Sequence, residues 1–277
     1  MSTALETVGV AARRAGWDSL MAGFVPGLPT LEQAVLDTAE RLSGPPRRVL
    51  DLGGGPGLFA GRMAARWPGA RIVLADIDPV LLALARDGLP ASVTVLPTDL
   101  ADPGWPARTG TGFDLVVAVM TVHYLAPESV WSLYAGVRRV LAPGGLLVVA
   151  DVMPDDGLPT VMRALDPAPP RTVLTPAASG SVPDAAGLVP AAAGFVPDED
   201  EFVPGRAGLA WSRWWAELAD DPSLQDLLAA RADIFRDRPP AEFTAGPAWH
   251  ADAARAAGFQ ETGLLWRSGR HAAFAAH

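Results

Sequence analysis

Glycines and an aspartate cluster between residues 49 and 57 in a pattern that suits ligand binding. The stretch reads Val-Leu-Asp-Leu-Gly-Gly-Gly-Pro-Gly, so Asp51 ends an apolar run. The glycines that alternate with other positions are Gly53, Gly55 and Gly57. Glycine lets the backbone approach a ligand because it has no Cβ. The spacing does not fit the G-x-G-x-x-G fingerprint of dinucleotide-binding loops, because Leu58 or Ala60 stands where the last glycine belongs.

Two further carboxylates follow apolar runs in the same way. Asp76 ends the run at 71–76, and Asp99 comes just after the run at 93–97. An ionised carboxylate accepts two hydrogen bonds, and its charge strengthens both. A carboxylate at the end of a strand can therefore bind a ligand with several hydrogen-bond donors. The alternatives are a helix cap for Asp51, a solvated carboxylate for Asp76 and a turn aspartate for Asp99.

A histidine follows the next apolar run and is a candidate for proton transfer. His123 stands in Thr-Val-His-Tyr after the run at 113–120. Histidine titrates nearest to neutral pH, which suits a general base. We expect His123 to be a catalytic base or to orient the substrate, and a structural role is the alternative. His250 is expected in a substrate pocket, whereas His271 and His277 are expected to be peripheral.

The order of these features resembles the class I S-adenosylmethionine (SAM)-dependent methyltransferases. The glycine loop is similar to that family's G-x-G-x-G motif. Phe113-Asp-Leu-Val resembles its fourth-strand motif, and Leu141-Ala-Pro-Gly-Gly resembles the turn before its fifth strand. The resemblance covers about residues 45–152 and is far more specific than a glycine loop alone. It implies that SAM is the cofactor.

The resemblance also implies roles for individual residues. Asp76 would hold both ribose hydroxyls, Asp99 would hold the adenine amino group, and Trp17 would fold over the cofactor as part of an N-terminal lid. Ordinary packing is the alternative for Trp17. The residues expected at the cofactor are Asp51, Gly53, Gly55, Gly57, Asp76, Ile77, Asp99, Leu100, Val119 and Trp17.

Apolar runs alternate with helical patterns through the first half of the chain. Strands are expected at 48–52, 71–76, 93–97, 113–120 and 146–152, and helices at 30–43, 58–67, 79–87 and 127–141. Such alternation predicts an α/β fold with a doubly wound, mostly parallel sheet. A C-terminal hairpin at 262–266 and 270–274 brings the sheet to seven strands. Ligands of such sheets bind at the carboxyl ends of the strands.

The second half of the chain is expected to hold an insert within a single domain, 1–277. The expected parts are an N-terminal helical lid (1–45), a SAM-binding core (46–152), the insert (153–247) and a C-terminal helix and hairpin (248–277). Residues 174–208 of the insert repeat a proline-containing heptad, which cannot form a coiled coil. We interpret this repeat as an extended surface linker, with a lid over the active site as the alternative.

Two helices are expected to complete the insert, at 209–219 and 222–236. Three tryptophans of the first, Trp211, Trp214 and Trp215, have spacings that place them on one helical face. Core packing is one interpretation of that face, and a hydrophobic substrate pocket is the other.

Composition narrows the class of protein. The 277 residues include 49% hydrophobic residues, no cysteine, no lysine and no asparagine, and the net charge is −9. Without lysine there is no Schiff-base chemistry and no GK[ST] phosphate loop. An acidic chain without a basic stripe is not expected to bind nucleic acid. No apolar run is long enough for a membrane span. We expect a cytoplasmic protein, with its oligomeric state open and a homodimer as one option.

The most specific functional hypothesis is methyl transfer from SAM to an oxygen of a small-molecule acceptor in secondary metabolism, with nitrogen or carbon as the alternative atoms. No metal is expected, because metal-assisted catechol methylation would use an asparagine. The place of the base-methylating [DNS]-P-P-[YFW] motif reads Met120-Thr-Val-His, which argues against DNA as the acceptor. The alternatives are a SAM-binding cyclase of the same fold and a non-catalytic SAM-binding partner. A nicotinamide oxidoreductase is disfavoured by the glycine spacing.

Overall fold

The computed structural model divides the chain into two compact units. Its described residues are 2–165, 205–238 and 243–277. The first unit consists of Met1–Leu165 together with Pro239–His277, and the second of Asp166–Arg238. We expected a single domain with an insert, and the second unit falls inside the range expected for that insert.

The proline-containing repeat falls almost entirely outside the described residues. Its last four residues, 205–208, are described and begin a helix rather than an extended segment. The interpretation of the rest as a linker or lid concerns residues that the structure does not describe.

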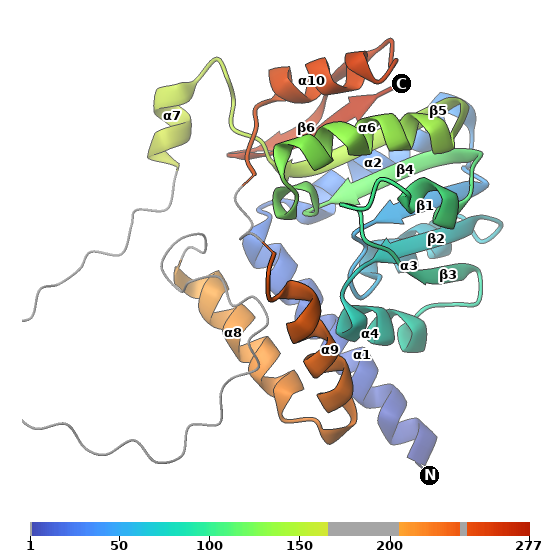
Figure 1. Ribbon diagram of the computed structural model, residues 1–277, viewed down its shortest axis with the longest axis vertical. Coiled ribbons are helices and arrows are strands. Elements are labelled where there is room, and N and C mark those ends of the chain that lie inside the picture. Colours follow the sequence, from blue (N-terminus) through green and yellow to red (C-terminus); the bar gives the residue numbers. More distant parts are fainter. Residues whose placement is uncertain (1, 166–204, 239–242) are drawn as a thin grey trace, which may run out of the picture. The chain divides into compact units, whose positions relative to one another are not determined.

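A seven-stranded sheet forms the centre of the first unit (Figure 1), and its order is β3-β2-β1-β4-β5-β7-β6. The strands are β1 (Arg48–Leu52), β2 (Arg71–Asp76), β3 (Val93–Pro97), β4 (Phe113–Val119), β5 (Leu141–Val152), β6 (Thr262–Ser268) and β7 (His271–Ala276). Strands β1 to β5 are parallel, and β7 pairs antiparallel with both β5 and β6. This confirms the predicted fold. The strand order reverses between β1 and β4, which is where such sheets bind ligands.

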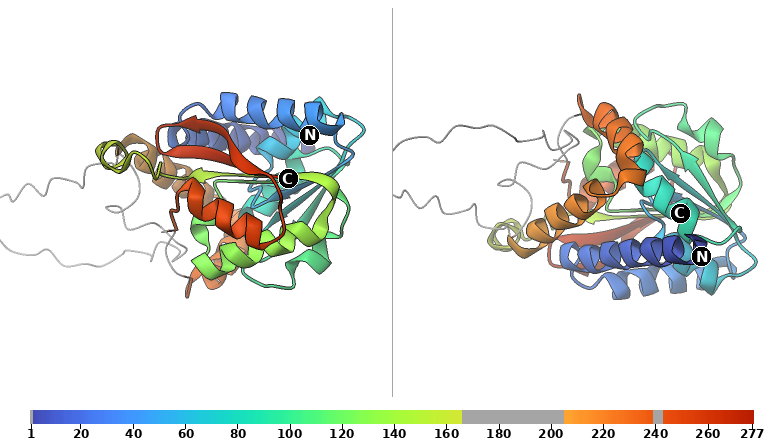
Figure 2. Two further views of the ribbon diagram at one scale, coloured as in Figure 1. Left: turned by 90° about the horizontal axis from the view of Figure 1, so that it is seen from above. Right: turned by 90° about the horizontal axis from the view of Figure 1, so that it is seen from below.

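Helices cover both faces of this sheet. Those of the first unit are α1 (Ser2–Phe24), α2 (Leu28–Ser43), α3 (Leu58–Arg66), α4 (Pro79–Gly88), α5 (Trp105–Thr109), α6 (Pro127–Val140), α7 (Pro159–Ala164), α10 (Pro247–Ala256) and the 3-10 helix η1 (Val122–Tyr124). Figure 2 shows α2 on one face and α6 with α10 on the other. Each face has its own apolar cluster, so neighbouring residues of β1 serve different cores: Leu50 packs on the α6 side and Val49 on the α2 side.

The second unit contains α8 (Gly205–Ala219), the 3-10 helix η2 (Pro222–Leu224) and α9 (Gln225–Phe235). We expected a single helix over 222–236. Its first turn is instead a 3-10 turn, in which the Asp221 carboxylate accepts a hydrogen bond from the Ser223 amide at 2.8 Å.

Several boundaries differ from those expected. Strand β5 begins at Leu141, five residues early, because Leu141 already pairs with Phe113 before the register shifts. Helices α5 and α7 were not predicted. The segment expected as a lid, residues 1–45, does not have a single role, because Leu31 and Val35 of α2 lie in the core. The second helix of that segment is therefore part of the scaffold.

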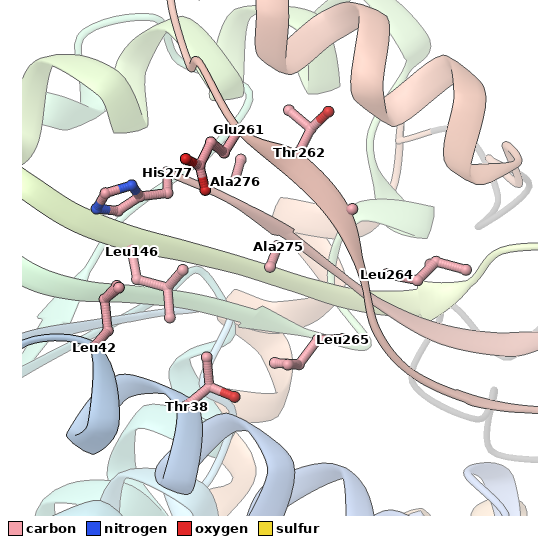
Figure 3. Close-up of a pocket in the computed structure, with 11 residues that line it drawn as sticks. Thr38, Leu42, Leu146, Glu261, Thr262, Leu264, Leu265, Ala275, Ala276 and His277 are labelled. Atoms are coloured by element: carbon pink, nitrogen blue, oxygen red, sulfur yellow. The ribbon is translucent and has the colours of Figure 1, made fainter.

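A shallow cleft lies between α2 and the C-terminal hairpin, as Figure 3 shows. Its volume is about 330 Å³, and its lining includes Leu42, Leu146 and Ala276. Leu146 belongs to the amino-terminal half of β5. The cleft is therefore remote from the carboxyl ends of the parallel strands.

Candidate active site

The glycine loop forms a tight turn that accepts no side chain at two of its positions. Gly53 and Gly57 have φ angles of 66° and 79°, in the left-handed region. A Cβ on Gly53 would lie 2.3 Å from Cγ2 of Thr121, and one on Gly57 would lie 2.4 Å from Cδ1 of Leu89. The turn therefore requires glycine for two separate reasons, the backbone angle and the close approach of neighbouring side chains.

Helix α1 lies against this turn. Trp17 has its ring 3.6 Å from where a Cβ on Gly55 would stand. The Arg14 guanidinium donates hydrogen bonds to the carbonyls of Pro56 at 3.0 Å, Gly57 at 3.1 Å and, on α4, Gly88. The structure thus places Trp17 beside the turn, and its contact with a cofactor stays a prediction. No local pattern in the sequence indicates the Arg14 contacts, because they join segments far apart in the chain.

Asp76 ends β2 and closes onto the same turn. Its Oδ2 accepts a hydrogen bond from the Gly55 amide at 2.8 Å, and its Oδ1 accepts one from the Asp78 amide at 2.9 Å. The residue is 8% exposed. Burial, with the charge of Asp78 adding to it, raises its pKa to about 6 against the effect of these amides. A solvated strand-end carboxylate, the alternative interpretation, is therefore wrong.

Asp51 is the most enclosed acid of the loop, at 2% exposure. It does not cap the next helix, because Gly57 is the N-cap residue of α3. Its Oδ2 is buried and has no hydrogen-bond partner among the described residues. Burial, followed by the charges of Asp76 and Glu32, raises its pKa to about 7. Within the described part of the chain, Asp51 is therefore an acid whose buried oxygen has no compensating partner.

The remaining residues expected at the cofactor all lie at the carboxyl edge of the sheet. Asp99 is half-buried just after β3, and its Oδ1 accepts a hydrogen bond from the Ala101 amide at 2.9 Å, as in a turn. Leu100 is buried, while Ile77 and Val119 are half-buried at the ends of β2 and β4. Their contact with a cofactor stays a prediction.

His123 and Asp151 form a buried pair beside this edge. Nδ1 of His123 lies 2.7 Å from Oδ1 of Asp151. Oδ2 of Asp151 accepts hydrogen bonds from the backbone amides of Thr121 at 3.0 Å, Val122 at 2.9 Å and His123 at 3.3 Å. Burial alone would raise the pKa of Asp151, but the imidazole and the amides outweigh it and hold that pKa below its ordinary value. An ionised Asp151 accepts a hydrogen bond from the Nδ1–H group, which leaves Nε2 as the basic nitrogen of the ring.

The sequence reasoning missed Asp151. The available signal was an acid inside the otherwise apolar run Leu-Leu-Val-Val-Ala-Asp-Val, at the carboxyl end of a predicted buried strand. A carboxylate in such a place is almost always paired. Its partner could not be read from the sequence, because it comes from η1, 28 residues earlier.

Met120 joins β4 to η1 in a strained conformation. Its φ of 52° is the one positive value among the described non-glycine residues. Hydrogen bonds on both sides hold it there, from its own amide to the Ala150 carbonyl at 2.7 Å and from the Thr121 amide to Asp151. Strain of this kind is found at functional sites whose surroundings determine the backbone.

Comparisons with known proteins agree with this geometry. Residues 49–145 match the protein family described as a methyltransferase domain. A trans-aconitate 2-methyltransferase of Paracidovorax citrulli is 36% identical over 108 residues, or 39% of each chain. A malonyl-[acyl-carrier protein] O-methyltransferase of Geobacter sulfurreducens is 37% identical over 105 residues, or 38% of each chain. The aligned part thus spans about two fifths of these relatives.

A solved structure shares the fold over a longer stretch. It is a putative O-methyltransferase of Nostoc punctiforme, with a TM-score of 0.51 at 16% identity, covering 89% of this chain and 55% of that one. Residues 49–145 therefore form a methyltransferase domain, and the fold is that of the class I SAM-dependent methyltransferases. The cofactor of this family is SAM.

The site at the glycine turn fits that cofactor chemically. SAM carries a ribose with two hydroxyl donors, an ammonium group and a sulfonium. Two buried carboxylates meet at the glycine turn, and one has an oxygen without a hydrogen-bond partner in the described part of the chain. Carboxylates in this position suit hydroxyl and cationic groups. The acids at the turn would hold the ribose and the positive end of the cofactor.

His250 is enclosed in the core instead of being exposed to a pocket. The residue is 1% exposed, and its Nδ1 lies 2.8 Å from the Tyr134 hydroxyl oxygen. Phe243 and Phe274 pack against its ring. Burial lowers its pKa to about 4, so the ring is neutral. This packing accounts for His250 structurally and does not favour the predicted contact with an acceptor.

Of the two histidines expected at the periphery, His271 begins β7 and His277 directly follows it. His271 pairs with Val152 of β5, and burial lowers its pKa, so it is less peripheral than expected. His277 is exposed, and its Nε2 lies 3.2 Å from the Gly144 carbonyl oxygen.

The tryptophans of the second unit share one face of α8, as their spacing predicts. The Trp215 ring lies 5.9 Å from that of Trp211 and 5.0 Å from that of Trp214. The guanidinium of Arg231, on α9, lies 3.9 Å from the centre of the Trp215 ring. The cluster therefore joins the two helices of the unit. Its use as an acceptor pocket stays a prediction.

The part of the chain that the structure describes contains neither a metal-ligand cluster nor a membrane-spanning helix. No group of three or more His, Asp or Glu side chains there is placed to hold a metal ion. None of the helices there is long and apolar enough to cross a membrane. A metal-free reaction stays a prediction.

Proposed function

We propose that this protein transfers a methyl group from SAM to an oxygen of a small-molecule acceptor, as an enzyme of secondary metabolism. One observation carries the proposal. The carboxyl ends of β1, β2, β4 and β5 bring together a glycine turn with two buried acids and a histidine oriented by an aspartate. The turn with its two acids suits binding of the cofactor, and the histidine with its aspartate suits removal of a proton from a hydroxyl group.

The residues of the turn would hold the cofactor. Asp76, already bonded to the Gly55 amide, has lone pairs left for two hydroxyl donors, because each carboxylate oxygen accepts more than one hydrogen bond. Trp17 would exclude water from one side of the turn. SAM supplies an activated methyl group on a sulfonium, so the protein mainly aligns the acceptor, which is worth roughly 7–11 kcal/mol.

His123 would take the proton of the acceptor. Asp151 fixes Nδ1 as the protonated nitrogen and stabilises the imidazolium that forms when Nε2 accepts a proton. The amides that bind Asp151 hold η1 and therefore hold the ring. Two observations support an oxygen acceptor. A hydroxyl group must lose a proton, for which His123 is a candidate base, and one relative is named as an O-methyltransferase.

Cofactor binding is the first test. Equilibrium titration of SAM should show affinity in the wild type and a loss of about 1.5–3 kcal/mol in Asp76→Ala, the scale of hydrogen bonds to a charged group. The matched control is Asp87→Ala, which removes an exposed acid of α4, close by in the sequence. Absence of SAM binding by the wild type, or equal affinity in both variants, would contradict the proposal.

Turnover is the second test. Methyl-labelled SAM is incubated with a panel of hydroxylated acceptors, and labelled product with adenosylhomocysteine is expected. His123→Gln should then slow the reaction at pH 7 by about 10²–10⁴-fold, the usual contribution of a general base. A rate and a pH profile that survive this change would show that His123 is no base. Unlabelled product with methylthioadenosine would instead indicate a cyclase.

A further inference from the structure

Asp51 and Asp76 bring two poorly compensated carboxyl groups to the ends of neighbouring strands. Both are buried, and the strands β1 and β2 that carry them pair directly. A Cβ on Gly54 would lie 2.7 Å from Oδ2 of Asp51, so this oxygen lies directly beneath the glycine turn. Oδ2 is also the atom without a hydrogen-bond partner among the described residues. A buried negative charge in this state is costly unless something positive or a proton reaches it.

The charged groups around the pair increase this cost. Glu32 of α2 adds a further negative charge near Asp51, and Asp78 adds one near Asp76. The guanidinium of Arg62 binds Glu32 and also Asp18 of α1, at 2.5 Å. These contacts engage Arg62 with acids outside the pair.

Arg14 is likewise engaged elsewhere, because its guanidinium donates to backbone carbonyls. The Gly55 and Asp78 amides bind Asp76 but not the buried oxygen of Asp51. Burial raises the pKa of Asp51 to about 7, and the charge of Asp76 adds to this shift. Burial, with the charge of Asp78 adding to it, raises the pKa of Asp76 to about 6.

We propose that the site without ligand holds a proton on the Asp51–Asp76 pair, and that a positively charged nucleoside releases this proton to solvent when it binds. The inference rests on the proposed function, because it assumes that SAM binds at this turn. A positive charge next to a carboxylate favours its ionised form, so ligand and proton compete. The pair thereby selects for the charge of the cofactor as well as for its sugar.

Competition of this kind has a measurable size. Only the ionised fraction of the pair is ready for the cation, and the apparent dissociation constant is the intrinsic one divided by that fraction. For a group that titrates near pH 7, the ionised fraction is about one half at pH 7 and about 3% at pH 5.5. The affinity for SAM should therefore fall roughly 15-fold between these two pH values.

Calorimetry on the full-length protein tests the exchange directly. SAM is titrated at pH 6.5 in two buffers with different heats of ionisation. The difference between the two measured binding enthalpies gives the number of protons released. We expect roughly 0.5–1 proton per SAM bound. The matched ligand is 5′-methylthioadenosine, which keeps the nucleoside and the sulfur but carries no positive charge. It should release less than about 0.2 proton, because it brings no charge to compete with the proton.

Asp51→Asn separates this exchange from simple cofactor binding. The variant should lose most of the proton release and most of the pH dependence, while Asp87→Asn on the exposed face of α4 should keep both. Circular dichroism melting shows whether each variant folds. If Asp51→Asn does not fold, the pH series on the wild type still shows whether SAM and the proton compete. SAM binding without proton release in the wild type would overturn this inference and leave the proposed function intact. No SAM binding at any pH would overturn both.

Discussion

Replacing Asp151 with alanine should destabilise the fold strongly, because its carboxylate serves several buried donors. Four backbone amides, those of Thr121, Val122, His123 and Val152, would lose their acceptor. A buried donor left without a partner costs about 1–3 kcal/mol, so the simple sum is about 4–12 kcal/mol. Water entering the vacated space satisfies some of the amides. We therefore expect a loss of about 3–5 kcal/mol in the free energy of unfolding.

Urea unfolding at pH 7.5, followed by far-ultraviolet circular dichroism, measures this loss. The matched control is Asp155→Ala, which removes an acid four residues later that is 31% exposed and lies 3.6 Å from the Arg267 guanidinium. An ion pair this exposed contributes about 0–1 kcal/mol. An Asp151→Ala variant within about 1 kcal/mol of the wild type would refute the reasoning.

The pH dependence of the same difference gives an independent check. The pKa of Asp151 is lower in the folded protein than its ordinary value. Its contribution is therefore fully present above that ordinary value, about 3.9, and is lost as the pH falls through the folded-state pKa. The gap between wild type and Asp151→Ala should narrow below about pH 4. A gap that stays constant down to pH 2 would contradict an ionised Asp151.

Asp151→Asn tests the orientation of His123 separately from stability. The amide side chain keeps one oxygen acceptor. It offers an N–H group at the place where the carboxylate accepted a hydrogen bond from Nδ1–H. The imidazole should then shift its proton to Nε2, which nitrogen-15 chemical shifts of the ring report. If the ring keeps its proton on Nδ1 in this variant, Asp151 does not set the tautomer.

Three further changes have expected outcomes. Gly53→Ala should lower stability by about 2–4 kcal/mol in thermal melts, because it combines a left-handed φ with a clash against Thr121. Gly69→Ala, with open space around its Cβ, should cost little, and equal losses would contradict this account. Arg14→Met should speed amide hydrogen exchange in α1 about tenfold, since it removes the bonds to the glycine turn, and unchanged protection would count against that tether. Burial lowers the pKa of His250 to about 4, so the unfolded chain takes up a proton at this residue before the folded protein does. The free energy of unfolding should therefore fall by about 3 kcal/mol as the pH drops from 6.5 to 4. A His250→Gln variant should lack that slope in pH-dependent urea titrations, and an unchanged slope would assign it to another group.

Local signals in the sequence were enough to predict the parallel sheet and the position of its ligand edge. Strands β1, β2 and β3 run over the predicted residues, because each is an apolar run bounded by glycine, proline or aspartate. The helix start at residue 79 was also predicted, and there Oδ1 of Asp78 binds amides only two and three residues ahead. Capping, turn formation and strand alternation depend on neighbours within a few positions, so they can be recognised without the fold.

Contacts between distant segments were decided only by the folded chain. Asp151 meets His123 from 28 residues away, and His250 meets Tyr134 from 116 residues away. The buried oxygen of Asp51 lacks a partner because of where the glycine turn and Glu32 lie around it. Strand register and helix packing set these distances, and a shift of one residue would turn each side chain to the other face of the sheet. The acids and histidine could therefore be named as candidates from the sequence, whereas their partners and protonation follow from the burial and electrostatics of the assembled sheet edge.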